Sequence, residues 1–191
     1  MSCDHGWGDR PTRQRRSSDL LWQVMSAEDE AMTGSRYVGR PMEILLVEDS
    51  QLDARLTILS LRRVPFRYRM TLVRDGREAL RFLNHDVGFA QAPKPDLILL
   101  DLLLPQVDGL EVLRIVRETP ELDSIPVVVL SASDSEADRQ KCQHLRVDQF
   151  MPKPVNVEKF LKLIVDLEQH WQKDIILPRL DEGADDSLSG G

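Results

Sequence analysis

Five short apolar runs recur through the middle of the chain, and each is followed by a stretch whose apolar residues return every three or four positions. Runs of the first kind are typical of strands buried on both faces, and stretches of the second kind are typical of amphipathic helices. The pattern predicts strands at Glu43–Val47, Tyr68–Val73, Asp96–Leu100, Val127–Leu130 and Gln149–Met151. Short links between strand and helix imply right-handed crossovers, which predicts an α/β fold with a five-stranded parallel sheet, doubly wound by helices on both faces.

The predicted helices also carry start signals. A capping box pairs an N-terminal side chain with a residue three positions later, and it is predicted at Asp75 with Glu78, at Asp108 with Glu111, and at Ser133 with Glu136. Asn156 is expected to cap the last helix, which continues toward Trp171.

The first helix is predicted over Leu52–Arg63. Its apolar residues at helical intervals are expected to face the core, and they are Leu52, Leu56, Leu59 and Val64. Its arginines are left for solvent, and they are Arg55, Arg62 and Arg63.

Composition divides the chain into three parts. Residues 1–41 are rich in Arg, Ser, Asp and Gly and are expected to form a poorly ordered leader, and Met25, Met32 and Met42 are all possible starts. Residues 42–178 hold the predicted domain with a C-terminal extension, and residues 179–191 form an acidic tail that is expected to be disordered.

The bulk properties exclude several classes. A formal net charge of -7 argues against a general nucleic-acid binder, and no apolar run reaches the length of a membrane span. The Arg-rich start lacks the apolar region of a secretory signal, so a cytoplasmic protein is predicted. Two cysteines, Cys3 and Cys142, give neither a disulfide framework nor a metal motif.

Polar residues follow the predicted strands at the points where ligands bind in parallel sheets. Asp101 ends a run of Leu and Ile, Glu48 and Asp49 end the first strand, Ser131 ends the fourth, and Lys153 follows the fifth. The carboxyl ends of parallel strands share one edge of the sheet, so these five groups are expected to converge.

Each group taken alone has a plainer explanation. Glu48 and Asp49 are suited to cap the first helix, Ser131 is suited to a turn, and Lys153 is suited to a solvated surface. Asp101 is harder to explain, because an ionised group beside a buried strand needs a partner. Their joint occurrence favours a functional site.

Four segments resemble motifs of the CheY-like receiver domains of response regulators. ILLVEDS matches the acidic pair, DLLLPQVDG the phosphoacceptor loop, VVLSAS the Ser/Thr position, and FMPKP the aromatic, Lys and cis-Pro region. The resemblance covers about residues 42–171, with the motifs in order and at the usual spacing. It implies a flavodoxin-like (βα)5 receiver fold.

The resemblance implies roles in phosphoryl transfer. Asp101 would accept a phosphoryl group from a histidine of a sensor kinase, and Lys153 and Ser131 would contact the phosphoryl oxygens. Ser131 and Phe150 would form the conformational switch. The domain would catalyse only its own phosphorylation and dephosphorylation and would not be an enzyme in the ordinary sense.

The resemblance also implies a magnesium cofactor. Mg2+ would be bound by Asp49, Asp101 and the backbone carbonyl of Leu103, with Glu48 acting through a water. Leu103 departs from the polar residue common among similar regulators, which leaves the rate of phosphate loss open.

The long link at His85–Lys94 and the ending HWQKDIILP resemble stand-alone, single-domain regulators of phytochrome-type sensor kinases. Apolar residues from Trp171 to Pro178 favour a homodimer, while folding back on the same domain stays open.

Two other functions share some of these sequence features. A dehalogenase-like phosphatase needs a second Asp two residues after the nucleophile, where this chain has Leu103. A pseudo-receiver, which binds partners without phosphorylation, is the remaining alternative. Such a protein usually lacks an acid of the pair, the Lys or the phosphoacceptor, and this chain has all of them.

Overall fold

A computed structural model describes residues 25–26, 40–131, 139–140, 142 and 144–167 of the chain. The strands are β1 (Met25–Ser26), β2 (Met42–Val47), β3 (Tyr68–Val73), β4 (Leu97–Asp101), β5 (Val127–Ser131) and β6 (Gln149–Pro152). The helices are α1 (Gln51–Leu61), α2 (Gly76–Leu83), α3 (Gly109–Glu118) and α5 (Val157–Asp166). Each predicted strand is present, with its ends within a residue or so of the predicted ones.

The strands form one sheet in the order β1-β3-β2-β4-β5-β6. The five long strands β2 to β6 are parallel, which confirms the predicted doubly wound sheet. The two-residue strand β1 pairs antiparallel with Met70 and Arg69 at the edge. This pairing lies within the predicted leader and was not predicted.

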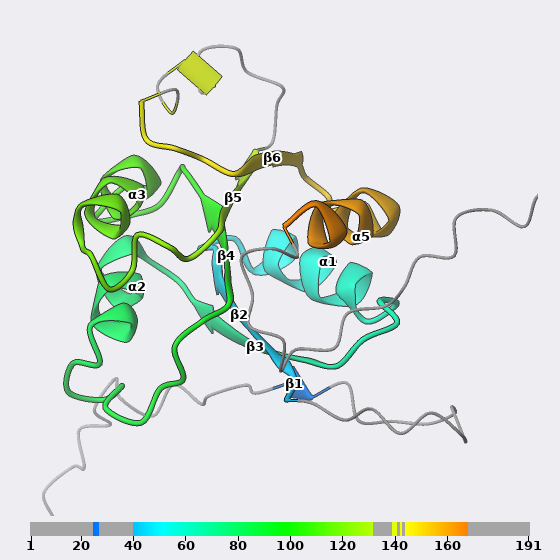
Figure 1. The fold of residues 1–191 in the computed structure, drawn as a ribbon, viewed down its shortest axis with the longest axis horizontal. Helices are drawn as coiled ribbons and strands as arrows, with labels where there is room; N and C mark the ends of the chain where they lie inside the picture. Colours follow the sequence, from blue (N-terminus) through cyan, green and yellow to red (C-terminus); the bar gives the residue numbers. More distant parts are fainter. Residues whose placement is uncertain (1–24, 27–39, 132–138, 141, 143, 168–191) are drawn as a thin grey trace, which may run out of the picture.

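Helices cover both faces of the sheet (Figure 1). Helices α1 and α5 pack on one face, where Leu61 and Phe160 lie in a core cluster with Leu46. Helices α2 and α3 pack on the other face, where Phe82 and Leu113 contact a second cluster. Neighbouring residues of one strand point to opposite clusters, so a strand between them is apolar on both sides, as residues 97–100 of β4 are.

Side chains cap the helices largely as predicted. The amides of Glu78 and Glu111 donate to Asp75 (2.7 Å) and Asp108 (2.8 Å), and the amide of Lys159 donates to Asn156 (2.9 Å). The predicted box at Ser133 and Glu136 lies outside the described residues. Ser50, rather than Glu48 or Asp49, caps α1 by accepting from the amide of Asp53 at 3.3 Å.

The prediction for α1 is wrong in one respect. Leu52, Leu56 and Leu59, here called the leucine stripe, are 67%, 38% and 54% exposed. The residues of α1 that are buried against the sheet are Ala54, Thr57 and Leu61. At 3.6 residues per turn these two sets lie on opposite sides of the helix. Small residues on the inner side let α1 lie close to the sheet, and the stripe is left outside.

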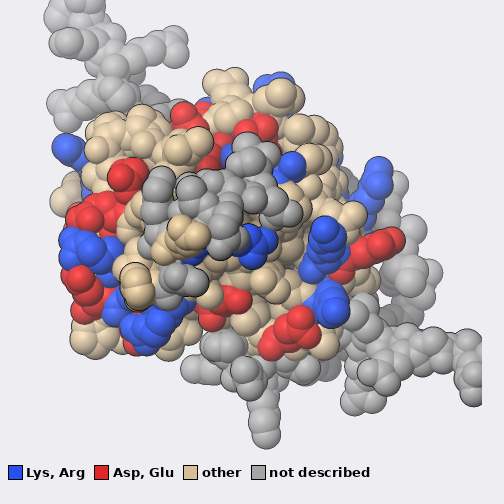
Figure 2. Space-filling model, turned by 90° about the horizontal axis from the view of Figure 1, so that it is seen from above, with Lys and Arg blue, Asp and Glu red and all other residues tan. Residues whose placement is uncertain are grey.

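The described helices give no sign of a membrane span, and one face of the molecule carries mixed charge. None of the helices formed by these residues has the length and apolar character to cross a bilayer. On the face shown in Figure 2, positive and negative side chains are interspersed, without the continuous basic patch that a phosphate backbone requires.

Candidate functional site

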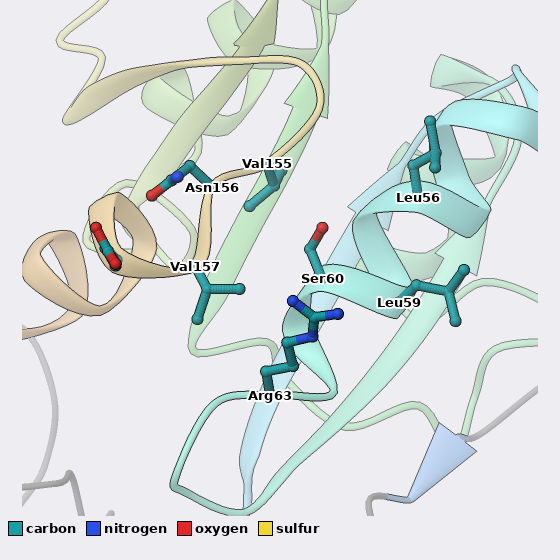
Figure 3. Close-up of a pocket in the computed structure, with 8 residues that line it drawn as sticks. Leu56, Leu59, Ser60, Arg63, Val155, Asn156 and Val157 are labelled. Carbon is teal, nitrogen blue, oxygen red and sulfur yellow. The ribbon is translucent and has the colours of Figure 1, made fainter.

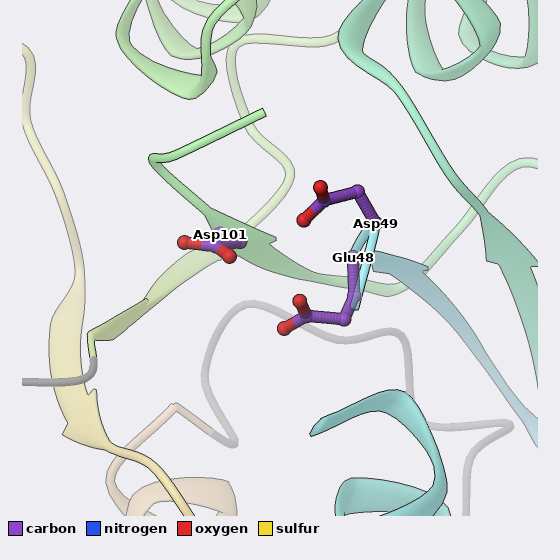
Figure 4. Close-up of side chains that lie close together, drawn as sticks. All are labelled: Glu48, Asp49 and Asp101. Carbon is purple, nitrogen blue, oxygen red and sulfur yellow. The ribbon is translucent and has the colours of Figure 1, made fainter. Parts of the chain in front are cut away.

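Three carboxylates meet at the carboxyl edge of the sheet. Glu48 and Asp49 follow β2, and Asp101 ends the neighbouring strand β4. One oxygen of each lies within 4.8 Å of the others, and the side chains of Glu48 and Asp49 extend toward Asp101 (Figure 4). Glu48 is fully buried, Asp101 is 7% exposed, and Asp49 is exposed at the mouth.

The backbone fixes this arrangement. In the parallel register Val47 lies opposite Leu100, so the residues that follow them come out side by side. The loop after β4 then folds tightly back, and the amide of Gly109 donates to the carbonyl of Leu102 at 3.0 Å. A side chain at Gly109 would place its Cβ 2.2 Å from the carbonyl oxygen of Asp101, so only glycine allows this approach.

Lys153 brings positive charge into the acidic cluster. Its Nζ lies 2.5 Å from Oε2 of Glu48 and 2.7 Å from Oδ2 of Asp101, and its side chain is 8% exposed. Burial alone would lower the pKa of Lys153, but the hydrogen bonds and charges of Asp101 and Glu48 outweigh it and raise the pKa. The ammonium is therefore charged at neutral pH.

Glu48 is the fully buried member of the cluster. Burial raises its pKa despite the opposing effect of Lys153. Its Oε1 accepts from the amide of Ser50 at 3.2 Å, whereas the buried Oε2 faces the ammonium of Lys153 in an ion pair. A buried carboxylate oxygen can accept more than one partner, so Oε2 is suited to bind a water or a cation in addition to Lys153.

Asp53 is a member of the site that the sequence pattern did not reveal. It lies in the first turn of α1, and its Oδ2 is 3.5 Å from Nζ of Lys153. Asp49 precedes the helix and Asp53 lies in its first turn. Acidic residues are common at this position, because they interact favourably with the positive end of the helix dipole. No motif distinguished it from an ordinary first-turn acid.

The other predicted residues surround the cluster. Leu103 is 79% exposed beside it, and its amide donates to Oδ1 of Asp101 at 3.1 Å. Ser131 ends β5, next to β4, and its carbonyl accepts from the amide of Lys153 at 2.8 Å. The peptide bond between Lys153 and Pro154 is cis, as the resemblance implied.

Phe150 lies on β6, partly buried against the core cluster on the side of α2 and α3. The guanidinium carbon of Arg139 lies 5.1 Å from the centre of its ring, within the range of a cation–π contact. The predicted switch pair thus occupies two neighbouring strands, since β5 pairs with β6.

The donor set fits a divalent cation. Three carboxylates this close repel one another by on the order of 4 kcal/mol per pair at about 4 Å and a dielectric of 20, and one lysine offsets only part of this. Oxygen ligands at the mouth of an open site are the ligands that Mg2+ or Mn2+ prefers.

Comparison with known proteins supports this interpretation. Residues 44–165 match the model of the response regulator receiver domain. The chain belongs to this family. Receiver domains are signalling domains rather than conventional enzymes.

Three relatives illustrate the similarity. Response regulator Rcp1 of Synechocystis sp. is 38% identical over 138 residues, which cover 72% of this chain and 94% of Rcp1. The structure of its Mn(2+)-bound form has a TM-score of 0.58. The bacteriophytochrome response regulator AtBRR is 41% identical with a TM-score of 0.63, over 70% of this chain and 96% of AtBRR. The phosphorylated cyanobacterial phytochrome response regulator RcpA is 38% identical with a TM-score of 0.60, over 73% of this chain and 99% of RcpA.

Proposed function

We propose that this protein is a single-domain response regulator of a two-component phosphorelay, phosphorylated on Asp101. The observation that carries the proposal is the cluster of Glu48, Asp49 and Asp101 within 4.8 Å, with Lys153 bound to two of the three. The phosphorylated relative RcpA supports it.

Asp101 is the nucleophile of the proposed reaction. One of its oxygens forms a bond to phosphorus while the bond from phosphorus to the kinase histidine breaks, and the leaving imidazole nitrogen keeps the electron pair. Lys153 contacts Asp101 before transfer and pairs with a phosphoryl oxygen afterwards. The hydroxyl of Ser131, at the end of the adjacent strand, donates to a second phosphoryl oxygen.

The proposed cofactor is Mg2+, which neutralises charge on the transferred group when it is bound. Asp49, Asp101 and the backbone carbonyl of Leu103 are the proposed ligands, and Glu48 acts through a water. The buried Oε2 of Glu48 and the convergence of the carboxylates support this set. The Mn(2+)-bound form of Rcp1 supports it as well.

The proposed output is a change of a protein-binding surface. Movement of Ser131 toward the phosphoryl group lets Phe150 move inward, which breaks its contact with Arg139. The proposed partner upstream is a sensor histidine kinase of the phytochrome type, by analogy with AtBRR and RcpA. A homodimer is proposed through the apolar segment from Trp171 to Pro178, which lies outside the described residues.

The experiment uses the full chain, Mg2+ and a small phosphodonor such as acetyl phosphate, with intact mass spectrometry and size-exclusion chromatography. The expected result is a phosphoryl-sized mass gain that is lost in Asp101→Asn and without Mg2+, together with earlier elution of the phosphorylated protein. If neither small donors nor a cognate kinase gives a mass gain, the protein is a pseudo-receiver that works by binding alone.

A further inference from the structure

The outer edge of the sheet, along β3, has room for a longer strand than β1. On its inner side β3 pairs with β2 along six residues, whereas on its outer side the described part of the chain pairs only Met70 and Arg69, with β1. Figure 1 shows β1 at this edge of the sheet. Backbone groups at an open strand edge are a template for a further strand. The edge is therefore suited to bind an extended segment.

The stretch that leads into β3 and through it is basic. Residues 62–74 contain five arginines and no acidic residue, in a chain whose formal net charge is -7. The side chains of Arg67 and Arg69 are exposed, and Arg69 pairs with Glu43 on the inner side of β3. A strand that binds at the outer side therefore gains most from an acidic residue opposite Arg67.

The register of β1 determines which residues would lie opposite β3 in a longer strand. Met25 lies opposite Met70 in an antiparallel pair, and the same register continues toward the start of the chain. The next three pairs are Trp22 with Val73, Gln23 with Leu72, and Val24 with Thr71. Directly opposite residues point to the same face of the sheet, so Trp22 would join Val73 at the core cluster that α2 and α3 cover. Apolar contact thus favours the longer strand.

In the other direction the register brings opposite charges together. Ser26 lies opposite Arg69, so two residues later Glu28 falls opposite Arg67. Glu28 is the first acid of the run EDE, which would continue beside the basic stretch. Opposite charges directly across two strands stabilise their pairing. The leader therefore matches the β3 edge in charge as well as in apolar character.

We infer that residues 22–28 bind along β3 as one continuous edge strand, in the register of Met25 and Met70 and with Glu28 paired to Arg67. The strand belongs to the same molecule and protects the β3 edge from pairing with strands of other proteins. This docking goes beyond the proposed phosphotransfer and does not depend on it.

The link to the domain is long enough for docking within one molecule. In the sheet order β1 is two positions from β2, a distance of about 10 Å. Residues 27–39 connect β1 to Arg40, and a segment of this length can span up to about 43–47 Å. A short flexible tether gives an effective concentration of about 1 mM, so the strand of the same molecule outcompetes that of a second copy at micromolar protein.

The groove between α1 and the start of α5 is a poorer site for this segment. Arg63 and Glu158 both line it, so it does not select an acidic strand (Figure 3). The backbone groups of its helices are largely paired within each helix, so it offers a strand few main-chain hydrogen bonds. The exposed side chain of Leu59 at this groove therefore provides a comparison position.

Disulfide trapping in the full chain tests the docking. Cys3→Ser removes one native thiol, and the buried Cys142 is kept. Val24→Cys is combined with Thr71→Cys, and the protein is oxidised with oxidised glutathione at several dilutions. A disulfide requires a Cα separation of about 4.4–6.8 Å, as directly opposite residues in a sheet have. The expected product is a monomer that has lost two hydrogens, in which proteolysis yields a peptide containing position 24 joined to one containing position 71.

The matched control is Leu20→Cys with Thr71→Cys. It keeps the thiol on β3 and moves the leader thiol by four residues, or about 14 Å along a strand, so the yield should be at least about fivefold lower. Val24→Cys with Leu59→Cys should be equally low. A yield for the test pair equal to those of the controls would overturn the inference. A crosslink found only between two chains would also overturn it, because the edge strand would then come from a second copy.

A charge exchange tests the register. Arg67→Glu added to the test pair places two acids opposite each other and should lower the yield several-fold. Adding Glu28→Arg as well should restore most of the yield, which a general loss of structure would not allow. Failure of the second change to restore the yield would contradict the pairing of Glu28 with Arg67. None of these outcomes bears on phosphorylation of Asp101.

Discussion

The two edges of the parallel sheet differ in how their acidic side chains are neutralised. At the amino edge, Arg40 pairs with Asp96 at 2.6 Å and Arg69 pairs with Glu43 at 3.1 Å. Two further pairs hold the loops that precede β5 and β6: Arg117, near the end of α3, pairs with Asp148 (2.8 Å), and Arg146 pairs with Asp123 (2.5 Å). Each of these four carboxylates has a guanidinium partner.

The carboxyl edge gathers as many acids around one lysine. Among the described ion pairs, Lys153 is the partner of Glu48, Asp53 and Asp101. Asp49 lies beside them at the exposed side of the cluster. Balanced pairs hold loops to the sheet, whereas an uncompensated cluster costs folding free energy unless a cation binds. The difference indicates that the amino edge serves the fold and the carboxyl edge serves chemistry.

The largest expected effect comes from breaking a pair at the amino edge. Arg117 is 7% exposed in its side chain, and besides Asp148 it donates to the carbonyls of Asp123 and Ile125. Arg117→Met removes these buried interactions and should lower the free energy of unfolding by about 3 kcal/mol, as measured by urea denaturation. Arg114→Met on the same helix removes only exposed pairs and should cost under about 1 kcal/mol. Equal losses would contradict the buried role of Arg117.

The second effect is on chemistry at the other edge. Asp49→Asn removes a proposed metal ligand and should lower the rate of phosphorylation by acetyl phosphate about 100-fold in millimolar Mg2+, with little loss of stability. Glu43→Gln is the matched change at the amino edge and should leave this rate unchanged. A similar rate loss in both variants would remove the distinction between the edges.

A smaller effect is expected at Asp53. Its contact with Lys153, at 3.5 Å, is longer than those of Glu48 and Asp101, so it adds little to the placement of the lysine. Its negative charge opposes the incoming phosphoryl group. Asp53→Asn should therefore raise the phosphorylated fraction about two- to fivefold at a fixed donor concentration, as measured by intact mass. A fall would show that Asp53 positions Lys153 instead.

The smallest effect concerns pH at the amino edge. Burial raises the pKa of Glu43, and the hydrogen bond and charge of Arg69 only partly oppose this. The folded state then holds the proton more tightly than the unfolded state, so the contribution of Glu43 to stability is present below its ordinary pKa and is lost as pH rises through the raised value. Urea denaturation from pH 4 to 7 should show wild type losing stability relative to Glu43→Gln as pH rises. The opposite slope would contradict this assignment.

The sequence predicted the parallel sheet and most of the acidic site because both follow from short-range patterns. A strand buried on both faces must be apolar throughout, which makes Asp101 stand out in β4 and Glu48 stand out after β2. The strand register then brings the ends together without further information.

The remaining features depend on tertiary contacts. Helix α1 has apolar residues on both sides, so periodicity could not tell the leucine stripe from the inner row that contains Ala54 and Leu61. Asp53 joins the site only through its contact with Lys153, a residue that follows β6 and is distant from Asp53 in the sequence. The pairing of β1 with β3 rests on two residues, too few to give a pattern.

The central claim is that the uncompensated carboxyl edge binds a divalent cation, and Mg2+ titration of the isotope-labelled full chain by NMR tests it most directly. The account predicts saturable amide shifts in the low millimolar range around Asp49, Asp101 and Lys153. These shifts should be absent at Glu43 and Asp96 and lost throughout in Asp101→Asn. Shifts of equal size at the two edges, or no saturable shift at the carboxyl edge, would contradict the account.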